Sequence, residues 1–115
     1  MVEWKADAAM VIPDGLVFSI RTQLAAQASR VAIPTIYPLR GFVEAGGLVS
    51  YGSNIAETFK QMGNYAGRIL KGEKPADLPV VQSAKFELVI NLRTAKAMGL
   101  KIPEAFLLRA DEVIE

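Results

Sequence analysis

The stretch that decides the fold runs from residue 8 to residue 38 and reads AAMVIPDGLVFSIRTQLAAQASRVAIPTIYP. It opens with a wholly apolar run, residues 8–12, which stops at Pro-Asp-Gly and predicts a central strand buried on both faces. Between Leu16 and Arg30 apolar residues recur at fourfold spacing, which predicts an amphipathic helix with Asp14 as its N-cap. A second short strand at 33–38 completes a βαβ unit, so the two strands are expected to pair in parallel.

The same alternation continues through the middle of the chain. Residues 39–45 predict one or two helical turns, and the apolar segment 48–51 predicts a third strand. Asn54 followed by Glu57 resembles a capping box, and the pattern predicts a long helix that ends near Lys71-Gly72. Its apolar residues share one face: Ile55, Phe59, Met62, Ala66, Ile69 and Leu70. Gly63 and Gly67 inside this helix predict close packing against a neighbour.

The C-terminal part supplies further strand and helix signals. Residues 73–79 are charged and contain two prolines, which indicates a surface connection. Strands are expected at 80–81 and 86–90, and a short helix at 94–98 that Gly99 ends. One more turn is expected at 105–108. The whole pattern predicts an α/β fold with about five strands, in which helices flank a mainly parallel, doubly wound sheet.

Composition narrows the function classes. The 115 residues carry 13 Lys+Arg against 12 Asp+Glu, a net charge of +1, which argues against an electrostatically driven nucleic-acid binder. The chain contains no cysteine and no histidine, which removes thiolate nucleophiles, the commonest general base and the commonest metal ligand. The glutamates are dispersed and no local spacing pairs an acid with a base. We therefore expect no enzyme, no metal and no cofactor.

Length and terminus set further expectations. A length of 115 residues suits a single domain or a fragment of a larger one. Residues 1–7 include three charges and lack the apolar core of a signal peptide, so the chain as written is expected to be cytoplasmic.

Four ordered stretches resemble one protein family. They are AGGLVSYG at 45–52, GRILKGEKPADLPV at 67–80, KFELVINLRTAK at 85–96 and RADEVI at 109–114. Together they resemble the C-terminal third of the substrate-binding proteins of ABC transporters. The branch in question has the type I periplasmic-binding-protein fold and includes binders of aromatic amino acids.

The resemblance implies a two-lobed protein, periplasmic in its full-length relatives, that traps a small solute in the cleft between its lobes. It would deliver that solute, such as an amino acid, to an ABC permease. By the resemblance, residues 8–52 form the end of the C-terminal lobe and residues 53–80 return into the N-terminal lobe. Residues 86–115 form the final crossing and a C-terminal helix.

Candidate ligand-binding residues follow the predicted strands, because ligands bind at the carboxyl ends of strands in doubly wound sheets. Asp14 suits an ammonium group, although a role only as an N-cap is the favoured interpretation of the same residue. Arg40 suits a carboxylate. The alternative interpretation is that Arg40 is a solvated surface residue. Tyr37 and Tyr51 suit a ring or an apolar side chain, and Ser50 suits a hydrogen bond.

A second hypothesis concerns the chain by itself. A two-lobed protein cut down to its last third would expose sheet edges and apolar helix faces. The alternative function is therefore a truncated α/β fragment that self-associates as a homodimer or larger homo-oligomer and has no ligand affinity.

Overall fold

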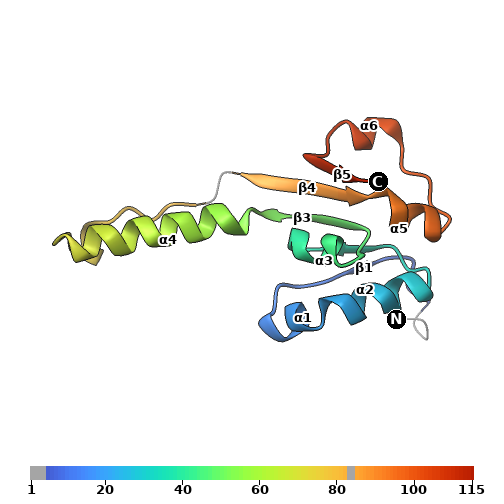
Figure 1. Cartoon of the computed structure of the whole chain (residues 1–115), viewed down its shortest axis with the longest axis horizontal. Helices are drawn as coiled ribbons and strands as arrows, with labels where there is room; N and C mark the ends of the chain where they lie inside the picture. Colours follow the sequence, from blue (N-terminus) through green and yellow to red (C-terminus); the bar gives the residue numbers. More distant parts are fainter. Residues whose placement is uncertain (1–4, 83–84) are drawn as a thin grey trace.

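A five-stranded sheet forms the centre of the molecule. The computed structural model describes residues 5–82 and 85–115, and in Figure 1 helices lie beside the sheet while one long arm extends from it. The strands follow the order β1-β2-β3-β4-β5. Strands β3 and β4 pair antiparallel, and the other neighbouring pairs are parallel. The expected α/β fold with a mainly parallel sheet is confirmed. The strand bounds are β1 Ala9–Met10, β2 Thr35–Tyr37, β3 Val49–Ser53, β4 Phe86–Asn91 and β5 Glu112–Ile114.

The helices connect successive strands. Helices α1 and α2 join β1 to β2, and α3 joins β2 to β3 and packs against β3 and β4. Among the described residues, no helix combines the length and apolar character that crossing a membrane requires. The helix bounds are α1 Gly15–Ser19, α2 Arg21–Arg30, α3 Arg40–Glu44, α4 Ile55–Leu70, α5 Leu92–Ala97 and α6 Glu104–Leu107, with a 3-10 turn, η1, at Pro75–Asp77.

The core centres on α3 and the middle strands. The Tyr37 ring stacks on the Phe42 ring with centroids 5.0 Å apart, and Phe18 meets Phe42 edge-on at 5.4 Å. Such aromatic pairs contribute about 0.5–1.5 kcal/mol beyond their buried area. The largest fully buried side chains are Tyr37, Phe42, Ile90, Val43, Val89 and Ser50.

The expectation of a central first strand is wrong. Strand β1 is two residues long and stands at the edge of the sheet, where β2 is its one partner in the described chain. Met10 is 76% exposed and Ile12 is 75% exposed. The apolar run indicated a segment that is favourable to bury, but its pattern carries no information on which part of the molecule would cover it. In this chain the segment is therefore left partly exposed.

The prediction of a single helix between Leu16 and Arg30 is also wrong, because Ile20 separates two helices, α1 and α2. At the break, the Ser19 hydroxyl donates to the Leu16 carbonyl at 2.6 Å. The Arg21 guanidinium donates to the Phe18 carbonyl at 3.1 Å. Side chains that compete for helical carbonyls in this way favour a bend, which accounts for the interruption.

Helix α4 forms the arm seen in Figure 1. The Asn54 side chain accepts from the Glu57 amide at 3.1 Å, so the predicted N-cap is confirmed. None of the helix's residues is buried, so its apolar face is uncovered in the described chain. A Cβ added at Gly63 or Gly67 would meet nothing within 4 Å, and the expected close packing is absent there.

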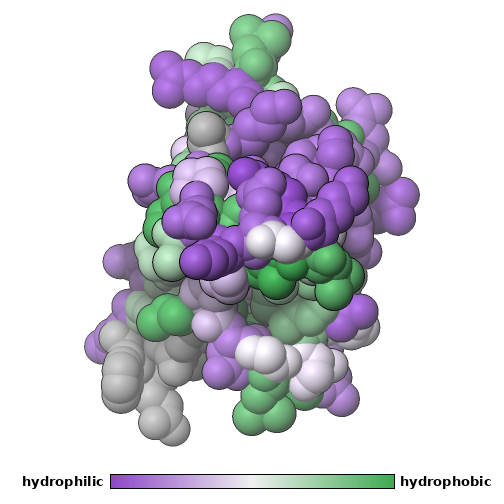
Figure 2. All heavy atoms as spheres, turned by 90° about the vertical axis from the view of Figure 1, so that its left-hand side faces the viewer, coloured by the Kyte–Doolittle hydropathy of each residue, from purple (hydrophilic) through white to green (hydrophobic). Residues whose placement is uncertain are grey.

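The arm makes the molecule elongated. The radius of gyration is 17.4 Å, whereas a compact chain of this length has a radius of about 13 Å. The principal extents are 56 × 31 × 20 Å. Figure 2 looks at the molecule from the arm's side and shows a largely hydrophilic surface with separate hydrophobic patches. The apolar residues of the arm are largely exposed, including Phe59 at 63% and Leu70 at 88%.

The C-terminal third differs from the prediction in two places. Residues 80–81 are not a strand, and Val80 is fully exposed. The fifth strand is instead β5, whose Val113 pairs with Ile90 of β4. The described chain thus ends in a strand, after the short helices α5 and α6, and not in a helix.

Candidate functional site

An apolar pocket lies where strands β1 and β2 reach their carboxyl ends. Its volume is about 280 Å³, close to the lower limit for small-molecule sites. None of its lining residues carries a charge at neutral pH, so the pocket suits the apolar part of a ligand. We call it the edge pocket; it is lined by Met10, Val11, Ile12, Pro13, Ile36, Tyr37, Pro38 and Tyr51.

Tyr51 borders the edge pocket and is stacked on a second ring. It is 55% exposed, and its ring lies 5.8 Å from the ring of Phe86 with 26° between the planes. The two residues stand on neighbouring strands, with Tyr51 paired to Leu88 in the register. Because aromatic faces are apolar and flat, this pair offers a platform for a ring or an aliphatic side chain.

Tyr37 lines the edge pocket and is also part of the buried core. The residue is 1% exposed, and its ring lies against Phe42 in the core. Burial raises the pKa of the Tyr37 phenol, and a hydrogen bond with the Thr35 side chain opposes that rise. The phenol is therefore neutral at physiological pH, and its ring belongs to the core beside the pocket.

Asp14 caps helix α1. One carboxylate oxygen accepts from the Leu16 amide at 2.8 Å and from the Val17 amide at 3.1 Å. The predicted N-cap is confirmed. Asp14 also borders an open apolar groove of about 600 Å³ formed with residues of α1 and α4, including Phe18 and Phe59.

Arg40 is the centre of an ion cluster. Its guanidinium lies 2.7 Å from Glu44, 2.6 Å from Glu112 and 3.8 Å from Glu87. Hydrogen bonds to Glu44 and Glu112 raise the pKa of Arg40 further above its ordinary value. These contacts tie α3 to β4 and β5, so Arg40 acts in the described chain as a structural link, and a role in ligand binding stays a prediction.

Ser50 is buried in the core. It is 1% exposed, and among the described residues its hydroxyl has no hydrogen-bond partner. It borders neither the edge pocket nor the groove beside Asp14. The structure thus brings Tyr37 and Tyr51 together at one pocket and leaves Asp14, Arg40 and Ser50 at three other places.

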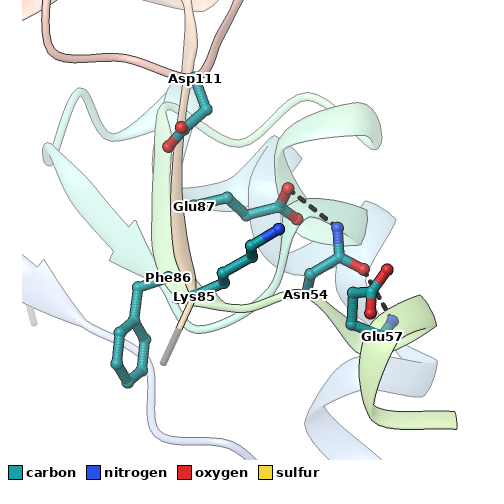
Figure 3. A pocket seen from close by; sticks show the side chains of 6 residues that line it. All are labelled: Asn54, Glu57, Lys85, Phe86, Glu87 and Asp111. Carbon is teal, nitrogen blue, oxygen red and sulfur yellow. Dashed lines mark hydrogen bonds between the residues drawn. The ribbon is translucent and has the colours of Figure 1, made fainter. Parts of the chain in front are cut away.

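A polar pocket lies at the start of β4, shown in Figure 3. Its volume is about 440 Å³. The Asn54 amide donates to Glu87 at 3.2 Å, and Phe86 points away from these polar side chains (Figure 3). Within the described chain no group of three or more acidic side chains is arranged to hold a metal ion. The pocket is lined by Asn54, Glu57, Lys85, Phe86, Glu87 and Asp111.

Comparison with known proteins decides the family. The family model for ABC transporter substrate-binding proteins matches residues 1–114. The chain belongs to this family. Its members bind substrates, which confirms the expectation of a binding protein and not an enzyme.

Three relatives illustrate the match. A tyrosine-binding protein of Clostridioides difficile (strain R20291) is 29% identical over 97 residues, which are 84% of this chain and 28% of that protein. The ABC domain of Streptococcus pneumoniae in complex with L-Trp is 31% identical with a TM-score of 0.88, covering 98% of this chain and 38% of that one. A conserved domain protein of Vibrio cholerae is 30% identical, also with a TM-score of 0.88, covering 95% and 37%. The chain described here therefore spans little more than a third of these structures and less of the curated relative.

Several residues of the edge pocket escaped the sequence-based prediction. Met10 and Ile12 lie in the run that the sequence marked as buried, so their exposure could not be anticipated. Phe86, which lies outside the edge pocket and stacks on Tyr51, was also missed; antiparallel pairing of β3 with β4 brings it there, with Ser53 facing Phe86. This pairing joins two strands that are separated by the whole of α4. The local sequence pattern does not predict such a pairing.

Proposed function

We propose that this chain is the C-terminal part of the solute-binding component of an ABC-type uptake transporter. In this proposal the edge pocket forms one wall of an interlobe cleft, which holds an amino acid with an aromatic side chain. The observation that carries the proposal is the exposed Tyr51–Phe86 stack beside an uncharged pocket. The tyrosine-binding and L-Trp-bound relatives support the ligand class.

The residues that line the edge pocket can bind only one part of the proposed ligand. An aromatic amino acid carries an apolar ring and a zwitterionic end, and the edge pocket offers partners for the ring alone. Charged partners for the ammonium and carboxylate groups would come from the remainder of a full-length protein. Closure of two lobes would then surround the ligand, as in hinge-bending binding proteins.

The arm supports the lobe assignment. In the proposed full-length protein, residues 8–52 end the C-terminal lobe, residues 53–80 return into the N-terminal lobe and residues 86–115 cross back. The unpartnered apolar stripe of α4, which includes Phe59 at 63% and Met62 at 58% exposure, would pack within that other lobe. The partner that receives the solute would be an ABC permease, and the full-length protein would be periplasmic.

Isothermal titration with L-tryptophan and L-tyrosine tests the proposal. The expected result is saturable binding of at least one of them by the protein, weakened about tenfold by Tyr51→Ala. Phe106→Ala is the matched control, because Phe106 is 42% exposed on α6 and is absent from the edge pocket. Binding that is insensitive to Tyr51→Ala, or no binding of either amino acid, would overturn the proposal.

Self-association is the second candidate, favoured by the exposed stripe of α4. Two copies could bury these apolar side chains against each other without a ligand site. Light scattering on the purified chain separates the candidates. A dimer that Phe59→Glu converts to a monomer, and that binds neither amino acid, would support self-association; a monomer that binds would exclude it.

A further inference from the structure

One glycine of β3 is crowded by backbone from another element. A Cβ built on Gly52 would lie 1.9 Å from the carbonyl oxygen of Pro38 and 3.0 Å from its carbonyl carbon. No side chain larger than hydrogen fits there unless one of the two backbones moves. Gly63 in the arm is the opposite case, since a Cβ there would meet nothing within 4 Å.

The two backbones that meet at Gly52 both lead into the edge pocket. Pro38 lines the pocket at the end of β2, and Tyr51, the neighbour of Gly52, lines it from β3. The contact between Gly52 and the Pro38 carbonyl therefore sets how closely these two sides of the pocket approach each other.

The Pro38 peptide is held from both directions, so it cannot absorb a displacement locally. Before it, Tyr37 is buried and stacked on Phe42. After it, the Leu39 carbonyl accepts from the Phe42 amide at 3.2 Å at the start of α3. Because cores are close-packed, a shift of Pro38 is transmitted to its neighbours and not lost in a flexible loop.

We propose that Gly52 is a positioning residue that sets the width of the edge pocket, and through it the ligand selectivity of the site. The inference rests on the proposed function for its binding consequence, but its structural part stands on the contact itself. Gly52→Ala should displace Pro38 relative to Tyr51 and change the fit of a large ring more than that of a smaller one.

The experiment compares Gly52→Ala with Gly63→Ala in the same protein. The first readout is the ratio of the dissociation constants for L-tryptophan and L-tyrosine. We expect Gly52→Ala to change this ratio at least threefold, whereas Gly63→Ala leaves it unchanged. A general loss of stability would scale both constants equally, so an unchanged ratio would overturn the selectivity role.

The second readout needs no ligand. Amide chemical-shift changes in Gly52→Ala should extend to residues 10–13 and 36–40 around the pocket. Changes confined to residues 51–53 would overturn the positioning role even if the unsubstituted protein binds neither amino acid, a result that would separately reject the proposed function.

A further variant covers the case in which Gly52→Ala does not fold. Leu39→Gly loosens the backbone directly after Pro38 and leaves every residue of the edge pocket in place. It should change the same ratio, or in the absence of binding shift the same amides. Leu39→Gly with neither effect would overturn the inference.

Discussion

The rings of Tyr51 and Phe86 stack 5.8 Å apart across the antiparallel β3–β4 pair, and both are half exposed. Exposed stacked rings on neighbouring strands are costly to leave in water, since burying an aromatic side chain is strongly favourable. The pair therefore marks the surface at which a ligand or another part of the protein gains most by docking.

Phe86→Ala should weaken L-tryptophan binding less than Tyr51→Ala does. Phe86 supports the Tyr51 ring but does not line the edge pocket, so its loss costs the stack alone, about 0.5–1.5 kcal/mol. Calorimetric titration of the two variants checks the order. A larger loss for Phe86→Ala would place the ligand on the Phe86 side.

Arg40→Gln should lower the free energy of unfolding by about 1 kcal/mol, because partly exposed ion pairs contribute little each. The difference should shrink in high salt, which screens the carboxylates left behind. Urea unfolding at two salt concentrations measures it. L-tryptophan affinity should stay within twofold; a tenfold loss without destabilisation would instead identify Arg40 as the partner of the ligand carboxylate.

Asp14→Ala should destabilise the protein by about 1 kcal/mol through loss of the α1 cap. Asp14→Asn keeps a side-chain oxygen and should be nearly neutral in thermal unfolding. The same Asp14→Asn variant reports on the ammonium hypothesis. If it is stable yet binds L-tryptophan at least tenfold more weakly, the carboxylate charge contacts the ligand.

Stability should fall as the pH rises above 10.0, the ordinary pKa of tyrosine. Burial raises the pKa of Tyr37 in the folded protein, so above that pH the unfolded chain loses the phenolic proton while the folded chain retains it. The stabilising contribution is complete below pH 10.0 and is lost as the pH passes through the raised value. Urea titrations of the protein and Tyr37→Phe measure this; an equal decline in both would contradict it.

Helix α4 should exchange its amides faster than β3 and β4, because no residue of α4 is buried. Gly63→Ala should slow that exchange about fivefold, the effect of roughly 1 kcal/mol of helix propensity. Gly47→Ala should behave oppositely and destabilise the fold, since its Cβ would lie 2.7 Å from the Tyr37 ring. Hydrogen exchange with mass detection and thermal unfolding test the two variants.

Local signals predicted much of the fold. The prolines at 34 and 38 bracket β2, Asn54 caps α4, and Gly46 with φ of +112° ends the α3 turn as the glycine pair indicated. Each of these features depends on a few neighbouring residues. Sequence reasoning therefore located them without knowledge of the tertiary structure.

Features set by distant neighbours were not predicted. The apolar run around Met10 reads as a central strand, yet the strand lies at an edge. Arg40 reads as a free cation, yet Glu112, far along the chain, pairs with it. The edge pocket shares this origin, because its residues converge only when β1, β2 and β3 are aligned in register.

The register of β3 with β4 has a consequence for how the molecule can be rebuilt. Ser53 and Phe86 face each other across the ladder, so the intervening residues 54–85 leave and rejoin the sheet at adjacent points. In topological terms the segment 54–85, which contains the arm, is the oversized loop of a β-hairpin. A two-residue turn can in principle replace this loop. A foreign domain can also be inserted at the same junction between β3 and β4.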